Sequence, residues 1–293
     1  MDFLLFLQEH QYPILVSIFE AISLIMDKTI IIALVSYLYW FTNKKTAHKI
    51  AVSYFLSGLA IQCMKITFRI PRPWVLDERI KPSEEMLETA TGYSFPSGHT
   101  QTATSLCYSL LDIVKKNWLR VILFIFPFLM MFSRMYVLVH SPLDVIVSFI
   151  VTAIIVVIAL KYLNKDYEKN LKTLAIIMLV GSLFGLIYTC YLVNAEIVTY
   201  TLAADSIKMM GAIMGYAAGC LLEMKTLNFE IKETTLVQKL VIMVIGLAGM
   251  LVMKSGLKVI LPDHMIVDFL RYGLTILWVI YLYPLLFTKF NKA

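Results

Sequence analysis

Long apolar segments, separated by short polar stretches, recur along most of the chain. A helix that crosses a bilayer needs about 20 mostly apolar residues, and several segments meet or approach this length. The pattern predicts nine membrane-spanning helices, the first of them short at its apolar core, over residues ~28–42, 49–68, 97–114, 119–139, 143–163, 173–193, 206–222, 240–259 and 269–288. Tyr and Trp near the ends of these spans, such as Tyr39, Trp40 and Trp118, are expected at the membrane interface.

Residues 3–26 are also apolar, but this segment carries Glu9, His10 and Glu20. Charged groups are costly inside a bilayer, so we expect an interfacial or re-entrant helix here, with a tenth span as the alternative. Residues 1–27 contain no Lys or Arg, whereas a secretory signal peptide begins with positive charge. We therefore expect no signal peptide, and we expect the N-terminus outside the cell.

The composition supports an all-α, polytopic integral membrane protein. Hydrophobic residues make up 59% of the 293 residues and charged residues only 16%, against about 25% charged residues in a soluble domain. This excludes a soluble enzyme, a disordered chain and a fibrous repeat. The four cysteines are widely separated, in apolar stretches and without a CxxC pair, so they predict neither a zinc site nor a disulfide framework.

The positive charge is distributed unevenly between the predicted loops. The net charge is +6, and 11 of the 26 Lys and Arg residues fall in four alternate loops, at 43–49, 115–118, 164–172 and 225–239. Cytoplasmic loops are enriched in Lys and Arg, so we place these loops inside. No dense Lys/Arg run is present, so nucleic acid is not expected as a partner. With this orientation, the positive residues around 65–81 and Arg134 lie outside. The enrichment of positive charge in cytoplasmic loops does not explain them, so their position needs a separate reason.

Three groups of polar residues fall at the predicted outer helix ends. They are Lys65 with Arg72-Pro73, then Pro96-Ser97-Gly98-His99, then Ser133-Arg134 with His140 and Asp144. Ionisable groups near a membrane core are candidates for function by default. The residues of these groups are therefore the candidate site.

The first two groups suit an anion. Lys65 and Arg72 are seven residues apart, about two helical turns, so we expect them to face one side. Arg offers a planar fork and Lys a point charge for phosphate. Pro96 and Ser97 are expected to open a helix whose free N–H groups attract an anion, with Gly98 allowing close approach of the backbone.

The third group suits nucleophilic chemistry. His140 and Asp144 are four residues apart and can share a helix face, with Asp144 accepting one imidazole N–H. The other ring nitrogen is then free to attack, while Ser141 and Pro142 supply a cap and a first-turn proline. Two histidines among cationic groups favour phosphoryl transfer, in which one histidine attacks and the other protonates the leaving oxygen.

These residues resemble the type 2 phosphatidic acid phosphatase (PAP2) superfamily. Its signature K-x6-RP, PSGH and SR-x5-H-x3-D is intact and in order over residues 65–144. The resemblance implies that His140 is the nucleophile and forms a phosphohistidine, that Asp144 orients it and that His99 is the general acid. It also implies that the phosphate is held by Lys65, Arg72, Arg134, Ser97 and the Gly98 backbone N–H. It implies no metal and no cofactor.

The resemblance also suggests the organisation of the chain. We expect an N-terminal interfacial helix over 1–27, a PAP2-like six-helix catalytic core over 28–193 and additional transmembrane helices over 194–293, as in long bacterial members. Two positions depart from many relatives, because Leu138 and Ser148 stand where those relatives have glycine. We interpret both as changes in helix packing.

The leading functional prediction is a membrane phosphatase acting on a lipid phosphate or diphosphate at the outer face of a bacterial plasma membrane. Phosphatidic acid, phosphatidylglycerol phosphate, undecaprenyl diphosphate and sphingoid phosphates all remain open as substrates. The alternatives are a phosphatase for a soluble ester, similar to glucose-6-phosphatase, a phosphotransferase, or a transporter or scaffold with a decayed site.

Two further patterns leave alternatives open. The spacings Gly181/Gly185 and Gly211/Gly215/Gly219 favour close helix packing within one chain, with a homodimer face as the alternative. Lys254, Lys258 and Arg271 are expected to reach lipid head groups, and a second contact with an anionic substrate is the weaker option.

Overall fold

A computed structural model describes the chain except for residues 27, 231–234, 261–263 and 291–293, and its described part contains helices and no strand. The helices from the N-terminus to the one that carries Asp144 are α1 (Asp2–Glu9), α2 (Pro13–Ile25), α3 (Lys28–Tyr37), η1 (Leu38–Thr42), α4 (Lys44–Phe68), α5 (Pro73–Leu76), α6 (Glu84–Thr89), α7 (Gly98–Leu111), α8 (Asn117–Tyr136) and α9 (Pro142–Leu163). The later helices are α10 (Tyr167–Asn194), α11 (Tyr200–Leu222), η2 (Glu223–Leu227), α12 (Leu236–Leu251), η3 (Val252–Gly256), α13 (Leu257–Ile260), α14 (Met265–Leu277), η4 (Trp278–Leu282) and α15 (Tyr283–Phe290). Here η marks π-helical turns.

Within the described residues, seven helical stretches are long and apolar enough to cross a membrane. They are Lys44–Leu76, Asn117–Tyr136, Pro142–Lys165, Tyr167–Asn194, Tyr200–Leu227, Leu236–Gly256 and Met265–Leu286. This confirms the predicted fold class, an all-α polytopic membrane protein. The two other predicted spans, 28–42 and 97–114, are helices that fall short of these criteria.

Helix α7 is short and polar because it lies inside the protein. Its buried side chains include Thr100, Gln101, Thr102, Thr104 and Ser105, and it packs against α4, α8 and α9. A helix that is surrounded by other helices contacts protein instead of lipid, so polar side chains on it can be paired within the fold. Its 14 residues need no continuous apolar surface.

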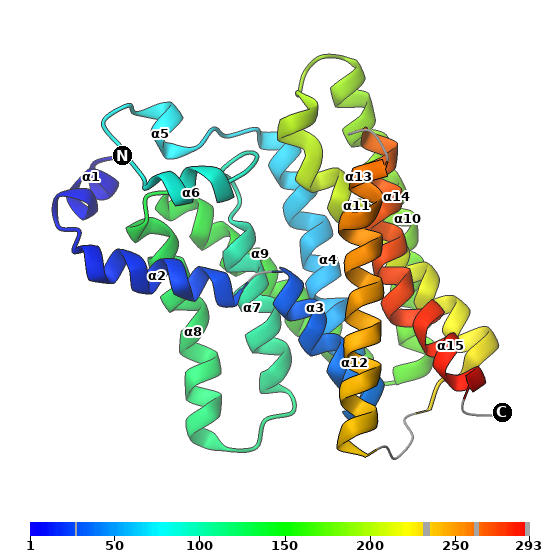
Figure 1. Cartoon of the computed structure of the whole chain (residues 1–293). Coiled ribbons are helices and arrows are strands. Elements are labelled where there is room, and N and C mark those ends of the chain that lie inside the picture. The colour runs from blue at the N-terminus through cyan, green and yellow to red at the C-terminus, as the bar shows by residue number, and fades with distance from the viewer. Residues whose placement is uncertain (27, 231–234, 261–263, 291–293) are drawn as a thin grey trace.

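Figure 1 shows two groups of long helices on either side of α4, with α7, α8 and α9 in one group and α10, α11, α12 and α14 in the other. Helices α5 and α6 lie at one end of the bundle, and the turn that joins α7 to α8 lies at the opposite end. Helix α2 runs crosswise over α8, where Phe19 packs edge-on against Phe132 and Tyr136. The interfacial placement of residues 1–27 stays a prediction.

The glycines of α11 bring this helix into backbone contact with α14. A Cβ atom added at Gly211 would lie 2.1 Å from the carbonyl oxygen of Phe269, and one at Gly215 would lie 2.0 Å from that of Gly273. Real side chains are never this close to a backbone atom, so only glycine fits at either position. The α11 glycine spacing therefore serves packing within the chain.

The expected placement of Tyr39 and Trp40 at the membrane interface is wrong. Both side chains are fully buried, and they donate hydrogen bonds to the carbonyl oxygens of Ile280 and Val279, each at 3.0 Å. They join η1 to η4, since their polar atoms satisfy backbone acceptors inside the fold. Trp118 is 62% exposed.

Candidate active site

Lys65 and Arg72, the two cationic residues of the first motif, both donate hydrogen bonds to carbonyl oxygens of residues 91–93. Helix α4 ends at Phe68, because Arg69 adopts a left-handed conformation (φ 52°), so Arg72 lies beyond the helix that carries Lys65. The expected two-turn spacing along one helix is therefore wrong. Instead, Lys65 Nζ donates to the carbonyl oxygen of Tyr93 at 2.6 Å, and Arg72 donates to those of Gly92 at 3.1 Å and Thr91 at 2.7 Å.

His140 lies in the turn before α9, and not on the helix as expected. Its Nδ1 atom is 3.5 Å from Asp144 Oδ2, and its Nε2 atom is 3.1 Å from Arg72 Nη1. Ser141 and Asp144 form a reciprocal capping box, in which the Ser141 N–H donates to Asp144 Oδ2 at 2.7 Å. This box caps the N-terminus of α9, which begins at Pro142, and fixes the carboxylate beside the imidazole.

These contacts determine which nitrogen of His140 carries the proton. A guanidinium can only donate, so Nε2 accepts from Arg72 and the ring proton sits on Nδ1, toward the Asp144 carboxylate. Burial, followed by the positive charge of Arg72, lowers the pKa of His140, while Asp144 opposes this shift. The imidazole is therefore neutral at neutral pH, with its free lone pair on Nε2.

Ser94 belongs to this arrangement and was not found from the sequence. Its buried hydroxyl donates to Asp144 Oδ2 at 2.6 Å and lies 3.3 Å from His140 Nδ1. A serine two residues before Pro96 was visible, but no spacing rule ties it to a carboxylate 50 positions later. It holds the carboxylate that orients the imidazole.

The second motif begins α7, as predicted. Ser97 caps the helix, its Oγ accepting from the Thr100 N–H at 3.4 Å and from the Thr100 hydroxyl at 3.1 Å. Gly98 and His99 line the cavity described below, whereas Ser97 and Asp144 do not. A Cβ atom at Gly98 would meet nothing within 4 Å, so the backbone there faces open space.

The two positions that depart from many relatives are both buried next to the site. Leu138 is fully buried with φ 63°, a left-handed conformation that glycine adopts without strain and leucine adopts at a cost of ~1–2 kcal/mol. The Ser148 hydroxyl donates to the Ser97 carbonyl oxygen at 2.6 Å, and the Ser97 N–H donates to the Asp144 carbonyl oxygen at 3.0 Å. Ser148 therefore strengthens the junction between α9 and the start of α7.

Arg134 approaches the site from the end of α8 and is buried. Its Nη1 atom donates to the Ser23 hydroxyl of α2 at 2.5 Å, and its Nη2 atom lies 4.0 Å from Met86 Sδ. Its Nε atom is buried and has no hydrogen-bond partner among the described residues. The N-terminal helix α2 thus positions one of the predicted phosphate ligands, a role for Ser23 that the sequence did not indicate.

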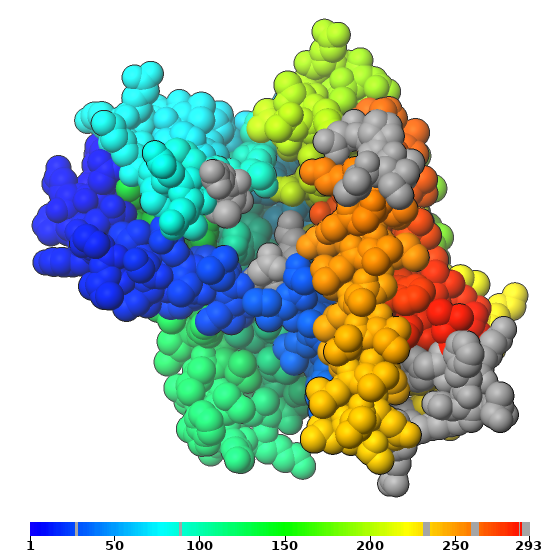
Figure 2. Space-filling view, viewed as in Figure 1, coloured from blue at the N-terminus to red at the C-terminus, as the bar shows by residue number. Residues whose placement is uncertain are grey.

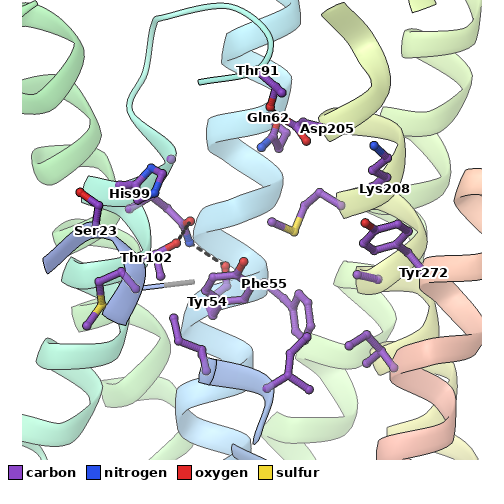
Figure 3. Close-up of a pocket in the computed structure, with 18 of the residues that line it drawn as sticks. Ser23, Tyr54, Phe55, Gln62, Thr91, His99, Thr102, Asp205, Lys208 and Tyr272 are labelled. Carbon is purple, nitrogen blue, oxygen red and sulfur yellow. Dashed lines mark hydrogen bonds between the residues drawn. The ribbon is translucent and has the colours of Figure 1, made fainter. Parts of the chain in front are cut away.

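A cavity of about 450 Å³ joins these residues. Its lining includes Lys65, Arg72, His99, Arg134 and His140, and many of its other lining residues are apolar side chains of α3, α4, α11, α14 and η4. Figure 3 shows His99 and Ser23 on one side of it and Lys208 and Tyr272 on the other. In Figure 2 the surface is hollowed between α6, α2 and α12.

Two segments of the chain match sequence models of known protein families. Residues 46–168, which include all three motifs, match the sequence model of the PAP2 superfamily. Residues 207–293 match the model of the PAP2 superfamily phosphatase transmembrane extension. The crystal structure of Aquifex aeolicus LpxE is similar over 55% of this chain and 94% of its own, with 26% sequence identity and a TM-score of 0.48. No curated protein sequence matches the chain.

Proposed function

Since the chain belongs to the PAP2 superfamily, as its three motifs predicted, we propose that it is a lipid phosphate phosphatase that works through a phosphohistidine. The observation that carries this proposal is the environment of the two ring nitrogens of His140. Its Nδ1 faces Asp144 and Ser94, and its Nε2 faces Arg72 at the edge of the cavity. A neutral imidazole held in this tautomer is a suitable nucleophile for phosphorus.

The reaction proceeds in two steps. His140 Nε2 forms a bond to phosphorus as the bond between phosphorus and the lipid oxygen breaks, and His99 gives a proton to that oxygen. Water then attacks the phosphohistidine, His99 takes a proton from the water, and inorganic phosphate leaves. Lys65, Arg72, Arg134 and the Gly98 N–H hold the phosphate oxygens and balance the developing charge, while the buried Ser97 caps the helix that presents this N–H.

Binding of substrate must first release the nucleophile. Arg72 makes four hydrogen bonds, three to carbonyl oxygens and one to His140 Nε2. An arriving phosphate oxygen takes over the N–H that faces His140, because a charged acceptor competes well with an imidazole. The same exchange frees the Nε2 lone pair and places phosphorus beside it.

A lipid substrate accounts for the shape and lining of the cavity. The cationic groups occupy one part of it, and the rest is bounded by apolar side chains such as Met26, Ile31, Val35 and Phe55, between helices that span the membrane. A small soluble ester has no apolar part to bury there. This contrast favours a lipid over the glucose-6-phosphatase-like alternative.

The test is release of inorganic phosphate by the purified full-length protein in detergent micelles. Phosphatidic acid, a polyprenyl diphosphate and glucose 6-phosphate are compared at equal concentration. We expect release from lipids only, abolished in His140→Gln and retained in His264→Gln, a control at an exposed histidine far along the chain. Preference for glucose 6-phosphate would refute a lipid substrate, and full activity of His140→Gln would refute the nucleophile.

We also propose that the site faces the extracytoplasmic side. The loops at 115–118 and 164–172, rich in Lys, lie at the end of the bundle opposite α5 and α6 (Figure 1). By the positive-inside rule, the end that carries the site is then outside. In intact bacterial cells and a background without the four cysteines, a membrane-impermeant thiol reagent should label Glu85→Cys and not Lys169→Cys, both at exposed positions. The reverse pattern would place the site in the cytoplasm.

A further inference from the structure

The wall of the cavity opposite the catalytic residues carries charge of its own. Lys208 of α11 and Lys254 of η3 both line the cavity, together with Asp205 and Tyr272. Figure 3 shows Lys208 and His99 on opposite sides of the open space. None of these four residues belongs to the PAP2 motifs, and all lie in the C-terminal helices that those motifs do not reach.

Lys208 is only weakly neutralised. Its Nζ atom is 3.7 Å from Asp268 Oδ2, beyond hydrogen-bond distance, and its side chain is 28% exposed. Asp268 already pairs with Arg271 through Oδ1 and accepts from the Tyr200 hydroxyl at 2.8 Å through Oδ2. The carboxylate therefore has a closer cation and a closer donor than Lys208, whose ammonium group keeps capacity for another anion.

Lys254 has a neutral partner. Its Nζ atom donates to the hydroxyl of Thr29 in α3 at 2.9 Å, while Arg271 Nη1 donates to the Lys254 carbonyl oxygen at 3.2 Å. The side chain thus bridges η3 and α3 at the cavity wall, in contrast to the expected extension toward lipid head groups. An ammonium group in a membrane-spanning helix is costly unless an anion compensates it.

Among the residues that the structure describes, the charges around this wall sum to a positive excess. Lys208, Lys254 and Arg271 provide three cations, and Asp268 and Asp205 provide two carboxylates. Asp205 accepts a hydrogen bond from the Thr91 hydroxyl at 2.6 Å, so it is engaged with the catalytic loop. The two lysines are consequently the groups that offer donors to a ligand in the cavity.

We propose that Lys208 and Lys254 form a second anion subsite, and that the preferred substrate is a lipid phosphate whose head group carries another anionic group apart from the phosphate that is removed. This deepens the proposed function and rests on it. Phosphatidic acid has only the phosphate that reacts, and a lipid diphosphate has its second phosphate directly bonded to the first. In a head group where a short polyol separates a phosphodiester from the terminal phosphate, the two anionic groups are apart and can contact different walls of one cavity.

The test compares kcat/KM for three lipids in the same mixed micelles, using the full-length protein. They are phosphatidylglycerol phosphate, which has a phosphodiester and a terminal phosphate, phosphatidic acid, and a polyprenyl diphosphate. The variants are Lys208→Met and Lys254→Met, with Lys208→Arg keeping the charge. Lys258→Met is the matched control, since Lys258 is exposed and lies four residues after Lys254.

We expect Lys208→Met and Lys254→Met each to lower kcat/KM for phosphatidylglycerol phosphate roughly tenfold, mainly through KM, because each removes a charge-assisted contact with substrate. Activity on the other two lipids should stay within about twofold of wild type, as should Lys208→Arg and Lys258→Met on all three. Equal losses on all three lipids would show a structural role and overturn the subsite.

A loss confined to the diphosphate would place the second anion beside the first and also overturn the subsite. Unchanged kinetics of both Met variants on phosphatidylglycerol phosphate would overturn it as well. Failure of the wild-type protein to release phosphate from any of the three lipids would refute the proposed function itself, and the subsite with it. The wild-type measurement therefore separates the two failures.

Discussion

Replacing Ser94 by alanine removes one hydroxyl group that joins the segment just before the second motif to Asp144 of the third. The Ser94 hydroxyl donates to Asp144 Oδ2 at 2.6 Å in a buried environment and lies 3.3 Å from His140 Nδ1. Without it, the carboxylate that orients the imidazole has one fewer constraint. We therefore expect Ser94→Ala to fold normally and to turn over slowly.

The magnitude follows from the kind of hydrogen bond that is lost. A hydrogen bond to a charged group contributes ~1.5–3 kcal/mol. Asp144 Oδ2 keeps the Ser141 N–H at 2.7 Å, so the carboxylate is not left unsatisfied, and we take the lower part of this range. A barrier higher by ~1.5–2 kcal/mol corresponds to a loss of roughly 10–30-fold in kcat/KM.

The assay is phosphate release from a lipid phosphate, with Ser109→Ala as the matched control. Ser109 of α7 is equally buried, and within the described part of the chain its hydroxyl has no hydrogen-bond partner, so its removal should leave kcat/KM nearly unchanged. Ser94→Ala should also add little to the loss caused by Asp144→Asn, because both changes act on one contact. Full additivity of the two changes, or a Ser94→Ala rate equal to that of Ser109→Ala, would refute the reasoning.

Three other expectations concern packing, pH and metal. Gly215→Ala should destabilise the protein by ~1–3 kcal/mol in a thermal unfolding assay, because the new Cβ atom would lie 2.0 Å from the Gly273 carbonyl oxygen. Gly256→Ala, where the nearest atom is 3.6 Å away, is the control, and equal stability of the two would contradict the packing. The acid limb of kcat/KM, corrected for substrate ionisation, should fall below the ordinary histidine pKa of about 6.5, because a lowered pKa keeps His140 neutral as the pH falls. A limb at or above that pH would argue against a neutral nucleophile. Activity should survive EDTA and be inhibited by vanadate, since cationic side chains stabilise the transition state, and a loss restored by Mg²⁺ would count against this.

Local features of the site could be predicted from the sequence. The helix starts after Ser97 and Ser141 were expected because capping depends on residues within one helical turn. The facing of His140 and Asp144 followed from their spacing of four, although the capping box places His140 just outside the helix. The family followed from three spaced motifs in order.

Contacts between distant segments could not be predicted. Ser94 meets Asp144 and Ser23 meets Arg134 across 50 and 111 positions, and nothing in either local pattern specifies the pairing. The approach of Arg72 to Lys65 was attributed to helical spacing, but it depends on the carbonyl groups of residues 91–93. Such pairings arise from tertiary packing, which a single sequence does not display.

The most direct test of the central claim is isolation of the phosphorylated enzyme. The wild-type protein is mixed with ³²P-labelled lipid phosphate, quenched in alkaline detergent within the first turnover, and digested for mass spectrometry. The account predicts label on His140, stable to base and lost in mild acid, as expected of a phosphoramidate, and no label in His140→Gln. Label on another residue, or rapid turnover with no labelled protein at any quench time, would contradict a phosphohistidine at His140.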